Sequence, residues 1–270
     1  MRKIRGFTLI ELIVVMVLMG ILGGTVAVFF KPAIDSYFDA RRRADMTDAA
    51  DTALRKMAQD IRRAVPNSLN IIDETTTDAN SACFQIVPTI GGGRYRTNID
   101  TADAAATALN DSSTAPFRMA IFSQQGTAAA AGDFVVINNQ NGDDVYDLTP
   151  AAIPPAPSRA TIDALGPPLT LSANPTASGY VGGRFQLVSK DETSVMYTCA
   201  NNTLTRKTLT TFAKKAACES DGVLVASNVS ECTFAYGDTD GLLTMSLVLS
   251  HTASGESINL GYAIHMDNTP

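Results

Sequence analysis

The chain has 270 residues, of which 45% are hydrophobic and only 18% are charged, and its formal charge is −6. This length suits one large domain or two small ones. A filament that binds nucleic acid needs a basic surface to neutralise phosphates, and an acidic chain argues against one. We therefore expect no nucleic-acid partner.

An apolar segment runs from Phe7 to Phe30 and contains one charged residue, Glu11. A helix of this length would extend roughly 36 Å, at about 1.5 Å per residue, which is enough to cross a hydrocarbon core of about 30 Å. Basic residues precede the segment and predict that this end of the chain stays in the cytoplasm. These are Arg2, Lys3 and Arg5. The sequence therefore predicts one membrane-spanning helix, with the rest of the chain exported.

The N-terminus differs from an ordinary secretory signal, in which a small-residue cleavage site follows the apolar stretch. No such site follows Phe30, where the chain continues into a polar helical pattern. The small residue, Gly6, lies before the apolar segment. Cleavage after Gly6 would remove three basic residues, lower the formal charge by three to −9, and keep the membrane helix.

Gly6-Phe7-Thr8-Leu9-Ile10-Glu11 resembles the recognition motif of prepilin peptidases. The motif is typical of the type IV pilins and of the pseudopilins of type II secretion. The resemblance implies cleavage between Gly6 and Phe7, followed by N-methylation of Phe7 by the same enzyme.

Glu11 is the residue to which the resemblance gives a role in assembly. A charged side chain at the centre of a membrane helix costs roughly 2.5 to 3.5 kcal/mol. In the pilin family, the amine that cleavage creates on Phe7 of a neighbouring subunit offsets this cost. The pair would be neutral and would fix the register between helices. The alternative is a Glu11 that reaches the interface or is protonated, and has no role.

Helical spacing continues beyond the membrane segment as an apolar stripe of residues three or four apart. The stripe comprises Met46, Ala50, Ala53, Met57, Ile61 and Ala64. Val65-Pro66-Asn67 ends the helix, so we expect about 58 residues from Phe7 to Ala64, with a bend at Pro32. Arg41-Arg42-Arg43 has two interpretations, a solvated or headgroup-binding face and a docking patch for an acidic neighbour.

In the middle of the chain the helical spacing gives way to short apolar runs, which are typical of strands. These runs are 69–72, 83–87, 117–123 and 134–137. Gly91-Gly92-Gly93 lacks the Lys-Ser/Thr of a phosphate loop and is interpreted as a flexible turn. Residues 100–115 are predicted to be an exposed excursion, and 149–180, rich in proline, a long connection. The turn at 138–144 carries many oxygen ligands, but its spacing does not fit an EF-hand calcium loop.

The last ninety residues have the clearest strand pattern. Asn201-Asn202 separates two short runs and predicts a two-residue hairpin. Residues 243–249 and 258–266 alternate apolar and polar side chains on either side of a loop at Gly255. They predict an antiparallel pair with one apolar face, which the helical stripe is able to cover.

Four cysteines in an exported domain indicate up to two disulfides, with three possible pairings. We favour Cys199–Cys218, which would close a short excursion, and Cys83–Cys232, which would join an early strand to the late sheet. Zinc is the rival interpretation, but no C-x-x-C pair is present and neither histidine lies at ligand spacing.

Candidates for catalysis are few. His251 lies at a strand end and His265 on the polar face of the last strand, so both are expected at the surface. No G-x-S-x-G or H-E-x-x-H motif and no framed pair of carboxylates occurs. We expect the protein to be the substrate of an enzyme and not itself an enzyme, with no cofactor and no metal.

These patterns and the resemblance predict an α+β, pilin-like fold. One long N-terminal helix, transmembrane in its first half, would pack on an antiparallel sheet domain. The expected parts are a leader (1–6), a transmembrane and filament-core half (7–30), an amphipathic half (31–65) and a β-rich domain (66–270). The chain would sit in the inner membrane with its C-terminal domain in the periplasm, and outside the cell in a pilus.

The chain resembles, over shorter stretches, the MshO group of minor pilins from mannose-sensitive haemagglutinin (MSHA) pili. These stretches are 40–68, 83–89 and 266–270. The resemblance implies a minor pilin that assembles into or primes a pilus at its tip. Its implied partners are the prepilin peptidase, other pilins and the inner-membrane assembly platform. The alternatives are a J-type minor pseudopilin of type II secretion, and a tip adhesin that binds through its long excursions.

Overall fold

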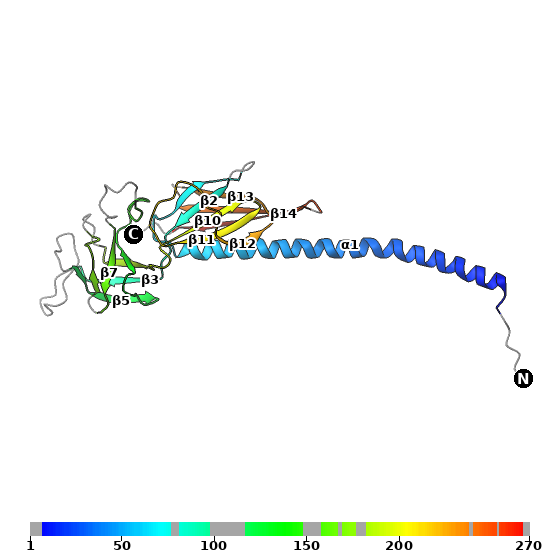
Figure 1. The fold of residues 1–270 in the computed structure, drawn as a ribbon, viewed down its shortest axis with the longest axis horizontal. Helices are drawn as coiled ribbons and strands as arrows, with labels where there is room; N and C mark the ends of the chain where they lie inside the picture. The colour runs from blue at the N-terminus through cyan, green and yellow to red at the C-terminus, as the bar shows by residue number, and fades with distance from the viewer. Residues whose placement is uncertain are drawn as a thin grey trace, which may run out of the picture. The chain divides into compact units, whose positions relative to one another are not determined.

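The computed structural model describes residues 7–76, 81–97, 117–147, 158–166, 169–176, 182–237, 240–252 and 254–266. Within these ranges the chain forms one long α-helix, α1 (Leu9–Arg62), and antiparallel β-sheets (Figure 1). The predicted α+β class is confirmed. The chain divides into two compact units, Met1–Asp48 and Ala49–Pro270, and α1 contributes to both.

Helix α1 has 54 residues and continues through Pro32. It is shorter at both ends than the expected span from Phe7 to Ala64. At its C-terminal end the backbone leaves the helix to pair with the strand region, because Ala64 forms a bridge with Pro88 and the Val65 amide donates to the Val87 carbonyl at 2.8 Å.

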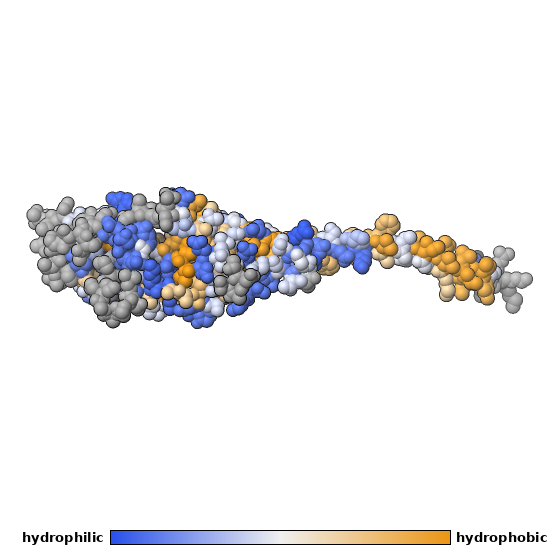
Figure 2. Space-filling view, turned by 90° about the horizontal axis from the view of Figure 1, so that it is seen from above, coloured by the Kyte–Doolittle hydropathy of each residue, from blue (hydrophilic) through white to orange (hydrophobic). Residues whose placement is uncertain are grey.

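The first half of α1 exposes apolar side chains on all sides. Ile10, Met19 and Phe29 are 67%, 68% and 78% exposed. Figure 2 shows the same concentration of hydrophobic residues over the N-terminal part of the helix. By length and composition this helix is able to cross a membrane.

The last turns of α1 are buried within the second unit, along the predicted stripe. Ala50, Ala53, Met57 and Ile61 are all at most 3% exposed. Leu54 and Ala58 widen this buried face. Small residues at three of these positions allow the helix to approach its neighbours closely, because alanine adds little side-chain bulk.

One carboxylate, that of Asp60, ties the end of α1 to the sheet. Asp60 is 1% exposed, and its Oδ2 accepts hydrogen bonds from the Tyr197 hydroxyl and from Arg206 Nε, each at 2.7 Å. Arg63 donates to Oδ1 at 2.9 Å. Glu192 binds the other end of the Arg206 guanidinium. The buried charge is therefore paired and hydrogen-bonded, as a stable buried carboxylate must be.

Burial raises the pKa of Asp60, but the hydrogen bonds from Arg206 and Tyr197 and the charges of Arg206 and Arg63 outweigh it. The net pKa lies below its ordinary value of 3.8. The carboxylate therefore remains ionised in the folded protein at neutral pH.

The sheet beside the end of α1 has five strands in the order β1-β2-β10-β11-β12. Their bounds are β1 (Asn70–Asp73), β2 (Ala82–Ile86), β10 (Ser194–Ala200), β11 (Thr203–Leu209) and β12 (Val223–Ser227). The hairpin predicted at Asn201-Asn202 is confirmed, because Ala200 pairs with Thr203 across the two residues. Both asparagines have positive φ, as a tight two-residue hairpin requires.

A second sheet has the order β13-β14-β15, formed by β13 (Val229–Gly237), β14 (Leu242–His251) and β15 (Glu256–His265). The alternating pair predicted at the C-terminal end is confirmed, with ten residues of β14 paired to β15. Arg62 of α1 donates to the Tyr262 hydroxyl on β15 at 3.1 Å, which places the helix end beside this sheet.

The third sheet is inserted between β2 and β10, two neighbours in the first sheet. Its order is β4-β8-β7-β6-β9-β3-β5. The bounds are β3 (Gly91–Tyr95), β4 (Phe117–Met119), β5 (Ile121–Gly126), β6 (Phe134–Val136), β7 (Arg159–Ala164), β8 (Leu169–Leu171) and β9 (Arg184–Val188). The two end strands, β4 and β5, are separated in the chain only by Ala120, so the sheet curls back on itself. We call this part the inserted barrel.

The inserted barrel has its own apolar core and joins the rest of the unit through a second one. The core of the barrel includes Tyr95, Ile162, Phe185 and Leu187. The second cluster combines Val65 and Val87, which follow α1 and β2, with barrel residues and with the loops between the sheets. Its remaining members are Val136, Val145, Tyr146, Val188 and Phe212.

Two predictions for the inserted region are wrong. Gly91-Gly92-Gly93 is not a flexible turn but part of β3, which lies between β9 and β5. Glycine is needed there because neighbouring backbone approaches closely, and a Cβ on Gly92 would lie 2.7 Å from the Phe185 carbonyl oxygen. Residues 149–180 are not one long connection, since they contain β7 and β8. The excursion predicted at 100–115 lies outside the described residues.

The favoured disulfide pairing is also wrong, because the bonds are Cys83–Cys218 and Cys199–Cys232. Cys83 lies opposite Thr198, and Cys199 lies opposite Ala82. Side chains alternate between the faces of a sheet, so Cys83 and Cys199 point to opposite faces. Each cysteine therefore bonds the partner on its own side, Cys218 in a loop and Cys232 on β13.

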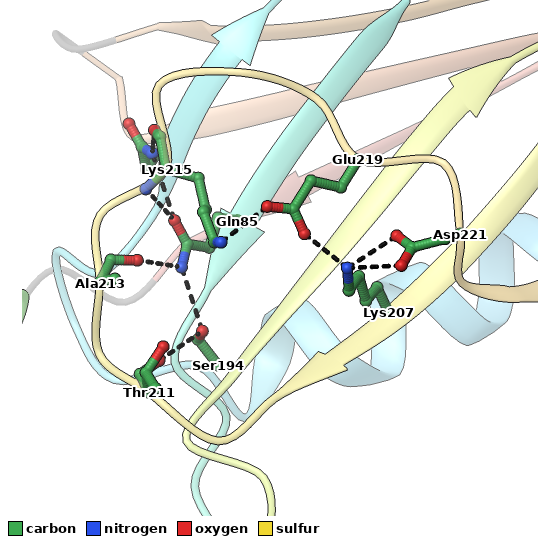
Figure 3. A network of polar contacts seen from close by, with 9 residues as sticks. Gln85, Ser194, Lys207, Thr211, Ala213, Lys215, Glu219 and Asp221 are labelled. Atoms are coloured by element: carbon green, nitrogen blue, oxygen red, sulfur yellow. Dashed lines mark hydrogen bonds and ion pairs between the residues drawn. The ribbon is translucent and has the colours of Figure 1, made fainter.

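The loop at 210–222 is held over β2 by polar contacts (Figure 3) and by the Cys83–Cys218 disulfide. The buried Gln85 amide donates to Ser194 Oγ and to the Ala213 carbonyl, each at 3.0 Å, and its oxygen accepts from the Lys215 amide at 2.9 Å. Glu219 binds Lys207 and Lys215, each at 2.6 Å. The hydrogen bond from Lys207 and then that from Lys215 lower the pKa of Glu219.

We predict that Asp60→Asn lowers the free energy of unfolding by about 3 kcal/mol at pH 7, because it removes one partner of a buried charge pair. The folded pKa of Asp60 lies below 3.8, so its contribution is complete above that pH and is lost as pH falls below it. Denaturant unfolding at pH 7 and pH 3 should show less loss of stability on acidification in the variant than in the wild type. The control, Asp51→Asn, removes an exposed pair with Arg55 and should cost less than about 1 kcal/mol. An Asp60→Asn protein as stable as the wild type would contradict this role.

The disulfide pairing predicts how cysteine substitutions combine. Cys83→Ser and Cys218→Ser should each cost about 2 to 4 kcal/mol of unfolding free energy, and the double variant should cost no more than either one. Cys83→Ser with Cys232→Ser breaks both bonds and should cost approximately the sum of the two. Denaturant unfolding under non-reducing conditions measures these values. If Cys83→Ser with Cys232→Ser cost no more than either single variant, and Cys83→Ser with Cys218→Ser cost the sum, Cys83 would instead be bonded to Cys232.

Candidate functional site

The N-terminal end of α1 is capped by a capping box that Thr8 and Glu11 form. Thr8 precedes the first helical residue, and its hydroxyl oxygen accepts the Glu11 amide at 3.3 Å. Glu11 Oε2 in turn accepts the Thr8 amide at 3.4 Å and the Thr8 hydroxyl at 3.3 Å. Two backbone donors that the helix leaves open are thereby satisfied by side chains.

This geometry keeps the Glu11 carboxylate at the very beginning of the helix. The partial positive charge of a helix N-terminus stabilises an anion placed there. Oε1 accepts no hydrogen bond from any residue in the described ranges, and Glu11 is exposed. A carboxylate has about four acceptor positions, so the capping contacts leave capacity for a further donor.

Phe7 lies directly before the cap and is 82% exposed. Gly6, the predicted cleavage residue, lies outside the described residues. Phe7 and Glu11 thus lie at the same end of α1, but the predicted cleavage and the predicted pairing between subunits stay predictions. A free amine on Phe7 would be separated from the capping residue by one peptide bond.

Thr8 has a structural role at the start of α1 that the processing motif does not predict. Thr8 is a member of that motif, and Thr-x-x-Glu before an apolar run is also the signature of a capping box. The signal was therefore present in the sequence. It means that Glu11 has a local structural role in addition to any role between subunits.

The four cysteines are all bonded in pairs, which overturns the rival interpretation of a zinc site. In the part of the chain that the structure describes, no group of three or more His, Cys, Asp or Glu side chains is placed to hold a metal ion. At the turn considered for calcium, Asp144 Oδ2 accepts the amides of Gln140 and Asn141 at 3.1 and 2.9 Å. That carboxylate oxygen closes its own turn.

The histidines and the arginine cluster complete the predicted candidates. His251 Nδ1 lies 3.1 Å from Ser254 Oγ at the β14–β15 turn, and His265 is exposed on β15. Arg42 forms an ion pair with Asp39 one turn earlier on α1, and Arg41 is exposed. The two histidines therefore lie at the ends of β14 and β15, and the arginine cluster lies on α1.

Comparison with known proteins gives one match. Residues 1–27 match the family described as the prokaryotic N-terminal methylation motif. No curated protein and no solved structure matches the chain significantly. The matched segment contains Gly6, Phe7, Thr8 and Glu11 and opens the helix that is able to span a membrane. The motif and the helix together support a place for this chain among the type IV pilins and pseudopilins, as a substrate of a prepilin peptidase.

Proposed function

We propose that the chain is a minor subunit of a type IV pilus, of the MSHA type, which primes assembly at the tip. In this proposal the peptidase cleaves between Gly6 and Phe7 and methylates Phe7. The mature helix then leaves the lipid and packs among the helices of other subunits. The observation that carries the proposal is an apolar helix, exposed on all sides, that opens on the methylation motif with an accessible carboxylate at Glu11.

The apolar half of α1 supports a role in assembly. Burying one Leu, Ile, Val or Phe side chain is worth about 1.5 to 3 kcal/mol, so many exposed ones require lipid or partner helices. Lipid satisfies them before assembly, and the helix bundle of a filament satisfies them afterwards. In a helix used only as an anchor, Glu11 would serve only as the capping residue.

The proposed partner of Glu11 is the Phe7 amine of a neighbouring subunit. The capping box holds the carboxylate at the helix start and leaves Oε1 open to a donor. In a low-dielectric bundle an ammonium–carboxylate pair is far stronger than in water. The pair would stabilise the axial register between helices that brings the amine to the carboxylate. Other registers would leave both charges unpaired.

The size of the exported part supports a minor subunit. The inserted barrel, β3 to β9, adds a second sheet and core to the helix-and-sheet body. Such bulk suits a subunit present once at a tip better than one repeated along a filament. The MSHA assignment rests on the resemblance of residues 40–68, 83–89 and 266–270. A J-type minor pseudopilin is the alternative, and the genes beside this one distinguish a pilus operon from a secretion operon.

The proposed location is the inner membrane before assembly, with the unit from Ala49 onward in the periplasm, and outside the cell once in a pilus. Two disulfides support an oxidising compartment for that unit. The remaining proposed partners are the inner-membrane platform and the other pilins. We propose no catalytic activity for the chain, since the motif makes it a substrate.

Substitutions at Glu11 separate the two roles of its side chain. Glu11→Gln keeps a capping side chain but removes the charge, whereas Glu11→Ala removes both. We expect both variants to be processed normally and to enter sheared filaments at about a tenth of the wild-type level or less, because each lacks the ion pair. Immunoblots of whole cells and of the filament fraction measure processing and incorporation.

The control is Thr8→Ser, which keeps the capping hydroxyl and the charge of Glu11 and should be incorporated like the wild type. If Glu11→Gln were incorporated normally while Glu11→Ala was not, the side chain would act only as a cap. That result would contradict the proposed pairing.

A further inference from the structure

A polar face on the outside of the inserted barrel lies over the strands β9, β3 and β5. The strand register places Arg184, Arg94 and Ser123 in one row across these strands, and Gln186, Gly92 and Gln125 in a parallel row. We call these six residues the arginine face. Neighbouring strands are about 4.8 Å apart, so each row spans about 10 Å.

Alternation along the strands fixes the direction of the arginine face. Tyr95 and Phe185, which adjoin Arg94 and Arg184 in the chain, are each 2% exposed in the barrel core. Because successive side chains point to opposite sides of a strand, Arg94 and Arg184 point outward, and both are exposed.

The face is hollowed where β3 has glycines in place of side chains. The hollow has a volume of about 490 Å³, and its walls include Arg94, Arg184, Ser123 and Gln125. Gly92 lies between Gln186 and Gln125 in the second row and contributes no side chain to fill the gap. The surrounding groups are guanidinium, amide and hydroxyl, which hydrogen-bond to polar ligands.

The two arginines lie directly opposite each other, and no acidic side chain in the described part of the chain forms an ion pair with either of them. Neither side chain makes a hydrogen bond or ion pair with any other residue in the described ranges, in contrast to Arg63, Arg159 and Arg206. Like charges directly across two strands destabilise a sheet. The chain carries a net charge of −6, so acidic residues are plentiful elsewhere. An anion from outside would relieve this repulsion.

We propose that the arginine face binds an anionic saccharide through its carboxylate or sulfate groups. Guanidinium groups bind such oxyanions with two parallel hydrogen bonds, and the glutamines and Ser123 would bind ring hydroxyls. A peptide fits this hollow less well, because both edges of β3 are already paired and the hollow offers no unpaired strand. The site adds ligand binding to the inserted barrel and does not depend on the filament role of α1.

Binding is tested with the full-length protein in detergent, immobilised and exposed to polygalacturonate, heparin, neutral dextran and poly-L-glutamate. We expect binding to polygalacturonate or heparin, which distinguishes a carboxylated from a sulfated ligand, and none to dextran. R94Q/R184Q should weaken binding at least about tenfold, since charged hydrogen bonds are lost. Its melting temperature should equal or exceed that of the wild type, because the opposed charges are removed.

The control is R55Q/K56Q, which removes two positive charges from exposed positions on α1 and should bind like the wild type. A second variant, Ser123→Asp, puts a carboxylate beside Arg94 and should block binding, whereas Ser123→Asn should not. The proposal is overturned if wild-type protein binds neither acidic saccharide, or if R94Q/R184Q binds as tightly as wild type. It is also overturned if R55Q/K56Q weakens binding equally or if poly-L-glutamate binds as tightly as the saccharides.

Discussion

The apolar surface of the first half of α1 is the constraint on which the rest of the molecule depends. Side chains such as Ile10, Met19 and Phe29 point outward from the helix and are exposed. Water solvates such a surface only at a large cost in free energy. The segment must therefore lie in lipid or among other helices, and a chain that keeps it is committed to one of these two environments. The capping box at Thr8 and Glu11 places a carboxylate at the entrance to that segment, where a partner with a free amine is able to use it.

The last turns of α1 also pack against the β-sheets, and the contacts of Asp60 attach the helix to them. Tyr197 and Arg206 reach the buried carboxylate from neighbouring strands, so the last turns of α1 and the five-stranded sheet form one body. The inserted barrel follows β2 and precedes β10 in the chain and has its own core, and the cluster around Val65 and Val87 joins it to the helix-and-sheet body. The inserted barrel thus adds a separate surface, the arginine face, to the helix-and-sheet body.

Local patterns in the sequence were sufficient for the helix, the Asn201-Asn202 hairpin and the final antiparallel pair, since each depends on residues close together in the chain. Features set by distant neighbours were not predictable in this way. Gly91-Gly92-Gly93 reads as a turn because glycine is rare in strands, and only the closeness of adjacent backbone explains it. Spacing alone also gave the wrong disulfides, because the faces to which Cys83 and Cys199 point depend on the register of β2 with β10. At the candidate site the motif identified Phe7 and Glu11, while the contact with Thr8 required the structure.

Mass spectrometry of the mature N-terminus tests the central claim most directly. The protein would be isolated from its native host and the first peptide sequenced by fragmentation. The account predicts a chain that begins at Phe7, with a methyl group on its amine and the apolar helix intact. A chain that retains Met1–Gly6, or one cut beyond Phe30, would contradict it.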